Sequence, residues 1–186
     1  MRKLIVFNMV SADGYFTDAG GDMSWAHKHD KEWTDFTSSN ASGNGVLVFG
    51  RKTYDLMVSY WPTPMAAENS PKVAEGMNRM EKVVFSRTMD KASWNNTKLV
   101  KTDLPSEIRK MKNEPGDGMV ILGSGTIVSQ LADEGLIDEF QIVMSPIALG
   151  KGRTIFEGLK KKIALKLTSS RVFGNGNVLL CYQPAQ

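Results

Sequence analysis

The sequence predicts an α/β fold, with a mostly parallel central sheet and an antiparallel hairpin at its C-terminal end. Apolar, β-branched runs alternate with amphipathic segments from the N-terminus to about residue 145. Strands that alternate with helices in this way form parallel sheets. The last two strand-like runs, residues 163–172 and 178–182, flank the sequence Gly-Asn-Gly-Asn at 174–177. That turn chemistry is typical of a hairpin between antiparallel strands.

The first predicted strand covers residues 3–9, which are almost continuously apolar, as in a strand buried on both faces. A loop rich in glycine and aspartate follows at residues 17–24. The next predicted element is a short amphipathic helix over residues 29–39, because Trp33 and Phe36 recur there at helical spacing.

A second buried strand, at residues 45–50, leads directly into a helix that begins at Arg51. Pro62 and Pro64 cannot continue this helix, since proline lacks the backbone N–H that a helix interior needs. Residues 65–80 are polar and rich in methionine, and they predict a loop with one short helix.

The second half of the chain continues the alternation of strands and helices. The expected elements are a strand at 81–86, a weak strand at 98–100, a helix at 104–112, a strand at 119–122, a helix at about 126–134 and a strand at 139–144. Gly135 fits the end of the last helix, where glycine takes the left-handed conformation. Pro146 ends the last strand, and a loop rich in Gly, Lys and Arg at 148–154 leads to the hairpin.

Composition narrows the class of protein. The 186 residues suit one domain, 1–186, and the apolar (41%) and charged (23%) fractions are those of a globular protein. The net charge of 23 − 20 = +3 is too small for a nucleic-acid-binding surface. A single cysteine, Cys181, excludes an internal disulfide and a multi-cysteine metal site. Without a secretory signal or a 20-residue apolar run, we expect a cytoplasmic protein with no membrane partner and no metal.

Three predicted strands end in sequences that suit an anion. The first is Gly50-Arg51-Lys52-Thr53 at a helix start, the second is Ser86-Arg87, and the third is Gly123-Ser124-Gly125-Thr126 before another helix. A helix N-terminus presents unpaired N–H groups to an anion, and the arginine fork matches a phosphate. Taken alone, the first also fits a glycine turn with solvated basic residues, the second fits a surface arginine in a salt bridge, and the third is a weak signal. Together, at one edge of a parallel sheet, they predict a site for a ligand with several phosphates.

A second group of polar residues follows the first strand. Ser11 and Asp13 come directly after it and face the same edge. Trp25 and Asp30 lie where the loop meets the next helix. Asp30 can act as a general acid or base beside a cofactor. It can equally be an N-terminal helix acid that complements the helix dipole.

The order and spacing of several short segments resemble the dihydrofolate reductase-like superfamily. Within it, nearly the whole chain is similar to the C-terminal reductase domain of the bifunctional riboflavin-biosynthesis deaminase/reductase. The segments that carry this resemblance are Ser11-Ala12-Asp13-Gly14-Tyr15, Gly50-Arg51-Lys52-Thr53-Tyr54, Tyr60-Trp61-Pro62, Phe85-Ser86-Arg87, Gly123-Ser124-Gly125-Thr126, Gly135-Leu136-Ile137-Asp138-Glu139-Phe140 and Ser145-Pro146-Ile147-Ala148-Leu149-Gly150-Lys151-Gly152-Arg153. The resemblance implies a three-layer dihydrofolate reductase-like fold.

The resemblance also implies NADPH as cofactor and a role for each matching residue. Arg51, Lys52 and Thr53, after Gly50, would hold its phosphates. The cofactor residues implied beyond that turn are Ser86 and Arg87 at the adenosine ribose and its 2′-phosphate, Gly123, Ser124, Gly125 and Thr126 over the pyrophosphate, and Phe16 near the nicotinamide. In dihydrofolate reductases the pyrophosphate turn contains a cis Gly–Gly bond, whose second position is Ser124 here.

Trp25 and Asp30 keep the spacing of the tryptophan and the pteridine-binding acid of dihydrofolate reductases, but His-Lys-His at 27–29 replaces the Leu-Pro before the acid. We therefore expect an NADPH-dependent reductase of a small heterocyclic or imine-like substrate, with Asp30 as its catalytic residue. The substrate-binding residues expected are Ser11, Asp13, Trp25, Lys151 and Arg153. A riboflavin-pathway reductase, a dihydrofolate reductase and a non-catalytic NADPH-binding protein stay open as alternatives. The resemblance further suggests a homodimer.

Overall fold

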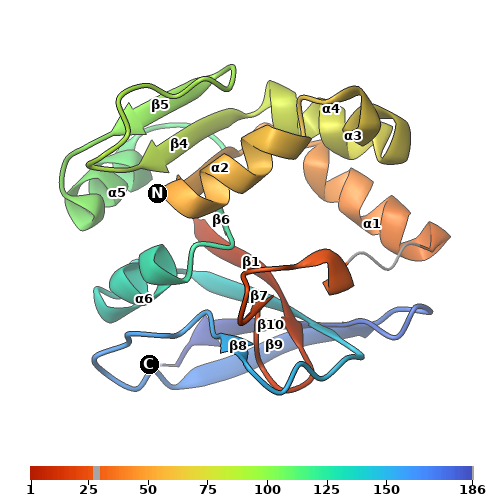
Figure 1. Cartoon of the computed structure of the whole chain (residues 1–186). Coiled ribbons are helices and arrows are strands. Elements are labelled where there is room, and N and C mark those ends of the chain that lie inside the picture. Colours follow the sequence, from red (N-terminus) through yellow and green to blue (C-terminus); the bar gives the residue numbers. More distant parts are fainter. Residues whose placement is uncertain (27–29, 186) are drawn as a thin grey trace.

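The computed structural model of the chain describes residues 1–26 and 30–185. Its centre is an eight-stranded sheet, drawn in Figure 1. In spatial order its strands are β5 (Thr97–Val100), β4 (Glu81–Phe85), β3 (Val46–Gly50), β6 (Met119–Leu122), β1 (Leu4–Ser11), β7 (Glu139–Ser145), β10 (Val178–Pro184) and β9 (Leu165–Val172). A separate two-stranded sheet pairs β2 (Thr17–Asp18) with β8 (Gly152–Arg153).

The directions of the strands confirm the predicted fold class. Neighbouring strands from β5 to β7 are parallel to each other. β10 then runs antiparallel to β7, and β9 runs antiparallel to β10, so the C-terminal hairpin forms one edge of the sheet. All the parallel strands therefore end at the same edge, where ligands bind in open α/β sheets.

Helices cover both faces of the sheet, which gives three layers. One face carries α5 (Leu104–Asn113) and α6 (Gly125–Asp133), and the other carries α1 (Lys31–Ala41), α2 (Arg51–Tyr60) and α4 (Pro71–Arg79). Strand β3 shows why: Val46 and Val48 pack in the core that contains α5 and α6, while Leu47 and Phe49 pack against α2 and α4. Successive side chains of a strand point to opposite faces, so its unbroken apolar run fills both cores.

The region of residues 62–80 differs from the prediction. It contains two helices, α3 (Pro64–Asn69) and α4, where one short helix was expected. Each begins with proline at its first position, where the missing N–H has no helical partner to lose. The Thr63 hydroxyl caps α3 by accepting a hydrogen bond from the Ala66 N–H at 3.3 Å. The Thr-Pro and Ser-Pro pairs were therefore start signals as well as breaks.

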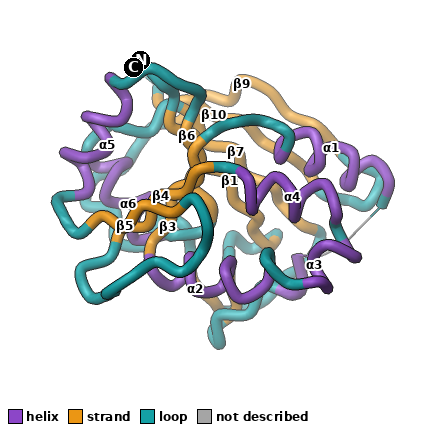
Figure 2. Tube along the Cα trace, turned by 90° about the horizontal axis from the view of Figure 1, so that it is seen from above, coloured by secondary structure: helices purple, strands orange, loops and turns teal. Residues whose placement is uncertain are grey.

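Helices α1 and α4 lie side by side, as Figure 2 shows from above. Gly76 of α4 permits this approach, because a Cβ atom at this position would lie 2.1 Å from the Ala41 carbonyl oxygen. The Arg79 guanidinium also donates hydrogen bonds to the carbonyl oxygens of Ala41, the last residue of α1, and of Ser42 and Gly43 after it. Within the described residues, no helix is both long and apolar enough to cross a membrane.

Candidate functional site

A cavity of about 780 Å³ lies at the carboxyl ends of β3, β4, β5 and β6. It collects residues from all three predicted anion turns. Every residue predicted to bind the cofactor lines it: Phe16, Gly50, Arg51, Lys52, Thr53, Ser86, Arg87, Gly123, Ser124, Gly125 and Thr126. The structure thus brings these residues together, because the four strands are neighbours and end at the same level of the sheet.

Two helices begin at this cavity. Helix α2 starts after Gly50 and α6 starts after Ser124, and no side chain of the described residues caps either N-terminus. The first N–H groups of a helix have no partner within the helix, and the helix dipole adds partial positive charge there. Both N-termini therefore offer hydrogen-bond donors to an anion in the cavity.

The two helix starts are hydrogen-bonded to each other. The Gly50 N–H donates to Ser124 Oγ at 2.9 Å, and the Ser124 N–H donates to Thr53 Oγ1 at 3.1 Å. Gly123 and Ser124 both have positive φ, 57° and 58°. The described residues contain no cis peptide bond, so the Gly123–Ser124 bond is trans and left-handed backbone makes the turn.

The charged side chains of the cavity are mostly cationic. Arg51, Lys52, Arg87 and Arg153 contribute four positive charges and Asp103 one negative charge, so the lining sums to 4 − 1 = +3. Among residues 1–26 and 30–185, neither Lys52 nor Arg87 forms an ion pair within 4.0 Å. Charges left without an internal partner favour an anionic ligand.

Asp103, the acid in this lining, is engaged elsewhere. Its carboxylate caps α5 by accepting from the Ser106 N–H at 3.0 Å and the Ser106 hydroxyl at 2.7 Å. These hydrogen bonds, with a smaller contribution from the nearby positive charges of Arg109 and Arg87, lower the pKa of Asp103. Asp103 therefore stays ionised at neutral pH. Among the described residues it forms no ion pair with the Arg87 guanidinium within 4.0 Å.

Phe16 forms an apolar wall at one end of the cavity. Its side chain is 6% exposed and lies against the start of α6, where a Cβ atom at Gly125 would be 3.4 Å from the ring. The Phe16 N–H donates to the Arg153 carbonyl oxygen at 2.9 Å, which holds the strand β2 beside β8.

Ser11 and Asp13 lie outside the cavity and bond to each other. The Ser11 hydroxyl donates to Asp13 at 2.6 Å, and the Asp13 carboxylate also accepts from the N–H groups of Leu149 (3.1 Å) and Gly150 (2.7 Å). These three donors lower the pKa of Asp13 to about 2. In this structure the pair connects the loop after β1 to residues 149–150. The predicted contact of Ser11 and Asp13 with a substrate stays a prediction.

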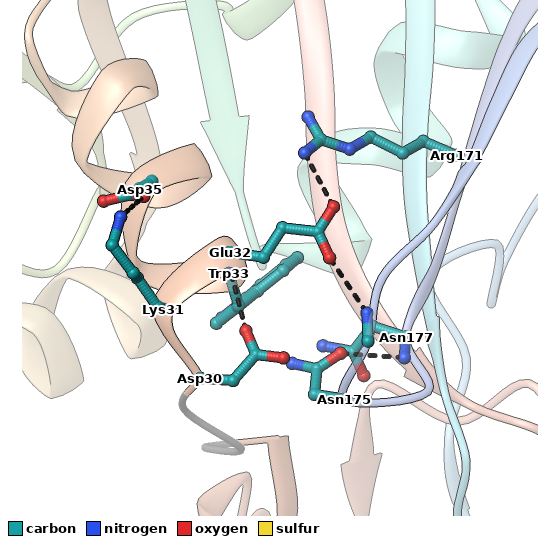
Figure 3. Close-up of polar contacts among 9 residues, drawn as sticks. Asp30, Lys31, Glu32, Trp33, Asp35, Arg171, Asn175 and Asn177 are labelled. Atoms are coloured by element: carbon teal, nitrogen blue, oxygen red, sulfur yellow. Dashed lines mark hydrogen bonds and ion pairs between the residues drawn. The ribbon is translucent and has the colours of Figure 1, made fainter.

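Asp30 lies at the N-terminus of α1, where Figure 3 shows its surroundings. One carboxylate oxygen accepts from the Trp33 N–H at 2.7 Å, so the helix-acid alternative describes its position. Asp30 does not line the cavity. Trp25 does not line it either, and its indole N–H donates to the Asp22 carbonyl oxygen at 3.2 Å. Residues 27–29, between them, lie outside the described part of the chain.

Glu32, one residue into α1, ties the helix to the C-terminal hairpin (Figure 3). Its carboxylate accepts from the Gly174 N–H at 3.0 Å and from the Arg171 guanidinium at 2.9 Å. The Gly174 hydrogen bond, and then that from Arg171, lower the Glu32 pKa. Arg171 also stacks over Phe173, with its guanidinium carbon 4.5 Å from the ring centre. This contact holds the turn at 174–177 beside Asp30.

The two basic residues predicted for the loop at 148–154 differ in position. Arg153 lines the cavity and forms an ion pair with Glu157 at 3.2 Å. Lys151 is exposed and lies outside the lining. Arg153 pairs with Thr17 in the β2–β8 ladder, and this pairing is what brings it to the cavity.

Sequence reasoning passed over four polar residues of the lining: Thr17, Thr102, Asp103 and Gln130. Thr102 and Asp103 follow β5, which ends at the same edge as β3 and β4, so the strand-end rule also applied to them. Gln130 lies four residues after Thr126 on α6, and such residues share a helix face.

One protein family and two bacterial proteins are similar to this chain in sequence. The model of the RibD C-terminal domain matches residues 2–179. The uncharacterized protein YyaP of Bacillus subtilis (strain 168) is 28% identical over 182 residues, which cover 97% of this chain and 94% of that protein. A second uncharacterized protein of that strain, YwjB, is 23% identical over 173 residues, 93% of each chain.

Solved structures share the fold. A protein of Shewanella sp. PV-4 has a TM-score of 0.73 at 24% identity, covering 99% of both chains. Dihydrofolate reductase from Enterococcus faecalis, complexed with NADP(H), has a TM-score of 0.66 at 15% identity, covering 99% of this chain and 97% of that one. The predicted dihydrofolate reductase-like fold is therefore confirmed.

The bifunctional diaminohydroxyphosphoribosylaminopyrimidine deaminase/5-amino-6-(5-phosphoribosylamino)uracil reductase of Thermotoga maritima has a TM-score of 0.68 at 16% identity. The match covers 99% of this chain but 57% of that protein. At identities below 25%, these structures establish the shared fold alone.

Proposed function

The chain belongs to the RibD C-terminal domain family, a family of reductase type, and on this premise we propose that it is an NADPH-dependent reductase of a small heterocyclic or imine-like substrate. The observation that carries the proposal is the cationic cavity at the ends of β3, β4 and β6. It combines two uncapped helix N-termini with a lining charge of +3. This is the chemistry that a dinucleotide with a further phosphate requires.

Different residues of the cavity fit different parts of such a cofactor. Lys52 and Thr53 at the start of α2, and Gly125 and Thr126 at the start of α6, would hold its phosphates by N–H groups and charge. Arg87 would recognise the 2′-phosphate, since its guanidinium lies at the end of β4 without an ion pair among the described residues. Bound NADPH supplies the hydride.

Phe16 would shield the reacting end of the cavity. Its ring closes the space beside α6, and an apolar wall there excludes water from the reacting atoms. The substrate would enter from the side of α1, where Asp30 would stabilise or pass on a proton to a C=N bond. The residues that we propose to surround the substrate are Ser11, Asp13, Trp25, Lys151 and Arg153. Of these five, Arg153 reaches the cavity.

The family membership supports a proposal for the substrate class. The Thermotoga maritima relative is named as a reductase of 5-amino-6-(5-phosphoribosylamino)uracil, and a pyrimidine of this type carries a phosphate that a basic side chain can bind. We propose a substrate similar to it. Dihydrofolate is the alternative substrate, and binding of an antifolate at nanomolar concentration would favour it.

A non-catalytic NADPH-binding protein is the second candidate. Asp30 favours it, because this carboxylate caps α1 and lies outside the cavity lining. Such a protein would bind NADPH and transfer no hydride to a pterin, a pyrimidine or a quinone.

The first test is a fluorescence titration of the purified protein with NADPH and with NADH. We expect micromolar or tighter binding of NADPH and weaker binding of NADH. Failure of both to bind below millimolar concentration would overturn the cofactor proposal. Consumption of NADPH with each acceptor in turn then separates the reductase from the non-catalytic protein.

The predicted homodimer stays a prediction, and sedimentation velocity measures it. β9 forms an edge of the sheet and carries Leu167 and Val172, 50% and 72% exposed. Such an edge suits pairing with a second chain.

A further inference from the structure

The turn that begins α6 contains a serine in a conformation that favours glycine. Ser124 has φ = 58° and is 8% exposed, and Asn96 is the other described non-glycine residue with positive φ. A side chain in the left-handed region is unfavourable unless its surroundings hold it there. The hydrogen bonds of Ser124 show what holds it.

The Ser124 hydroxyl connects β3 to the turn after β6 at a point beyond the last backbone pair of these two strands. Pairing of β3 with β6 ends at Val48 and Ile121. Two residues further along β3, the Gly50 N–H donates to Ser124 Oγ at 2.9 Å, while that hydroxyl donates to the Leu122 carbonyl oxygen at 3.1 Å. The side chain thereby joins the end of β3 to the turn after β6.

A second hydrogen bond runs in the opposite direction between the same two turns. The Ser124 N–H donates to Thr53 Oγ1 at 3.1 Å, from α6 to α2. The turn also leaves no room for a larger residue beside it, because a Cβ atom at Gly123 would lie 3.0 Å from the Thr53 side chain. We call Gly50, Thr53 and Ser124, with these two hydrogen bonds, the turn link.

The turn link also sets the direction of the Thr53 hydroxyl. Thr53 Oγ1 accepts a hydrogen bond from the Ser124 N–H, and within the described part of the chain the hydroxyl hydrogen of Thr53 donates to no other group. Thr53 lines the cavity, so the hydrogen can point to a ligand that only accepts. A phosphate oxygen is such an acceptor.

We propose that Ser124 is a positioning residue, which joins the starts of α2 and α6 into one preassembled clamp for a diphosphate group. The inference rests on the proposed function for the identity of the ligand. The hydrogen bonds of the turn link themselves exist without it. Preassembly favours binding because the two helix starts need not be ordered when the ligand arrives.

The variants Ser124→Gly and Thr53→Val each remove one of the two hydrogen bonds. Glycine adopts the left-handed conformation freely, so Ser124→Gly is expected to fold. Thr53→Ser keeps the hydroxyl and is the conservative variant. Ser129→Ala is the matched control, because Ser129 is a buried serine of α6 whose hydroxyl bonds to the Gly125 carbonyl oxygen of its own helix.

The first measurement is amide hydrogen exchange of the ligand-free protein. We expect the Gly50 N–H to exchange at least tenfold faster in Ser124→Gly. We also expect faster exchange at Gly50 in Thr53→Val, although Thr53 is not its acceptor. Unchanged exchange at Gly50 in Thr53→Val would show that the two hydrogen bonds act separately, and would overturn the single clamp.

The second measurement is the affinity for NADPH. We expect about tenfold weaker binding for Ser124→Gly and a larger loss for Thr53→Val, which also removes the hydroxyl that faces the ligand. The double variant should bind about as weakly as Thr53→Val alone, whereas Thr53→Ser and Ser129→Ala stay within about twofold. Losses that multiply would overturn the inference. If the wild-type chain binds no NADPH, the proposed function and the diphosphate fail, while the exchange measurement still decides whether the turn link is one unit.

Discussion

At the ends of β3, β4 and β6, polar groups face a cavity, whereas those after β1 and β7 are bonded to one another. Lys52 and Arg87 have no ion pair among the described residues, and the starts of α2 and α6 have no side-chain cap. By contrast, Asp13 accepts hydrogen bonds from three groups, and Asp30 caps α1.

The two regions share a sheet edge, but the cavity carries mostly cationic side chains, whereas Asp13 and Asp30 are carboxylates. They also differ in whether donors and charges find partners within the chain. Where they do not, a ligand can supply the partner, and where they do, the same groups stabilise loops. The region of β3, β4 and β6 is therefore the stronger candidate for ligand binding.

The variant Asp30→Asn tests this contrast with the largest expected effect. Asparagine is as good an N-cap as aspartate, so the denaturation midpoint should not change. If Asp30 carries the proton, hydride transfer to the best acceptor falls by about 100-fold. The measurement is the rate of NADPH consumption at saturating NADPH. An unchanged rate would mean that Asp30 only caps α1. The polar groups named for the bonded region would then stabilise the structure without taking part in the reaction.

Arg87→Gln addresses the open region. Loss of a charge-assisted hydrogen bond to the 2′-phosphate should weaken NADPH binding by about 10- to 100-fold and leave NADH binding unchanged. Fluorescence titration with both nucleotides measures this. The control is Lys162→Gln, which removes the same charge from a site outside the cavity lining. Equal losses for the two variants would mean that Arg87 acts only through net charge.

Glu32→Ala addresses the bonded region. It removes the hydrogen bonds to Gly174 and Arg171, and we expect a small fall in the denaturation midpoint, because both partners are solvent-exposed. Glu68→Ala, in an exposed acid of α3, is the control and should have little effect. Denaturant unfolding measures the change, and NADPH affinity should stay the same. A large loss of affinity would show that the two regions are coupled.

The smallest expected effect is the pH dependence of the Asp13 contact. The pKa of Asp13 in the folded chain is about 2, below its usual 3.8, so the unfolded chain binds the proton more readily. The stabilisation is therefore fully present above pH 3.8 and is lost as the pH falls towards 2. An NMR titration of the Leu149 and Gly150 amide signals should show a midpoint near pH 2. A midpoint near 3.8 would contradict this contact.

Much of the fold was predictable because its signals are local. The apolar run of β3 and the glycine after it place a buried strand before a helix, and both lie where expected. The helix at 126–134 was displaced by one residue, to Gly125–Asp133. Of the two helices in residues 64–79 only one was predicted, because Pro64 was read purely as a break and Pro71 was passed over as a start signal, although both stand at helix starts.

The sequence by itself determined the strand order along the chain and which strand ends carry phosphate-type residues. These follow from apolar patterns and turn residues within short segments. Only the tertiary structure decided which polar groups were left for a ligand. Asp13 meets Leu149 and Gly150, and Ser124 meets Gly50 and Thr53, across more than 70 residues of sequence. Such partners come together only when the strands stand in the sheet, so no local pattern encodes them.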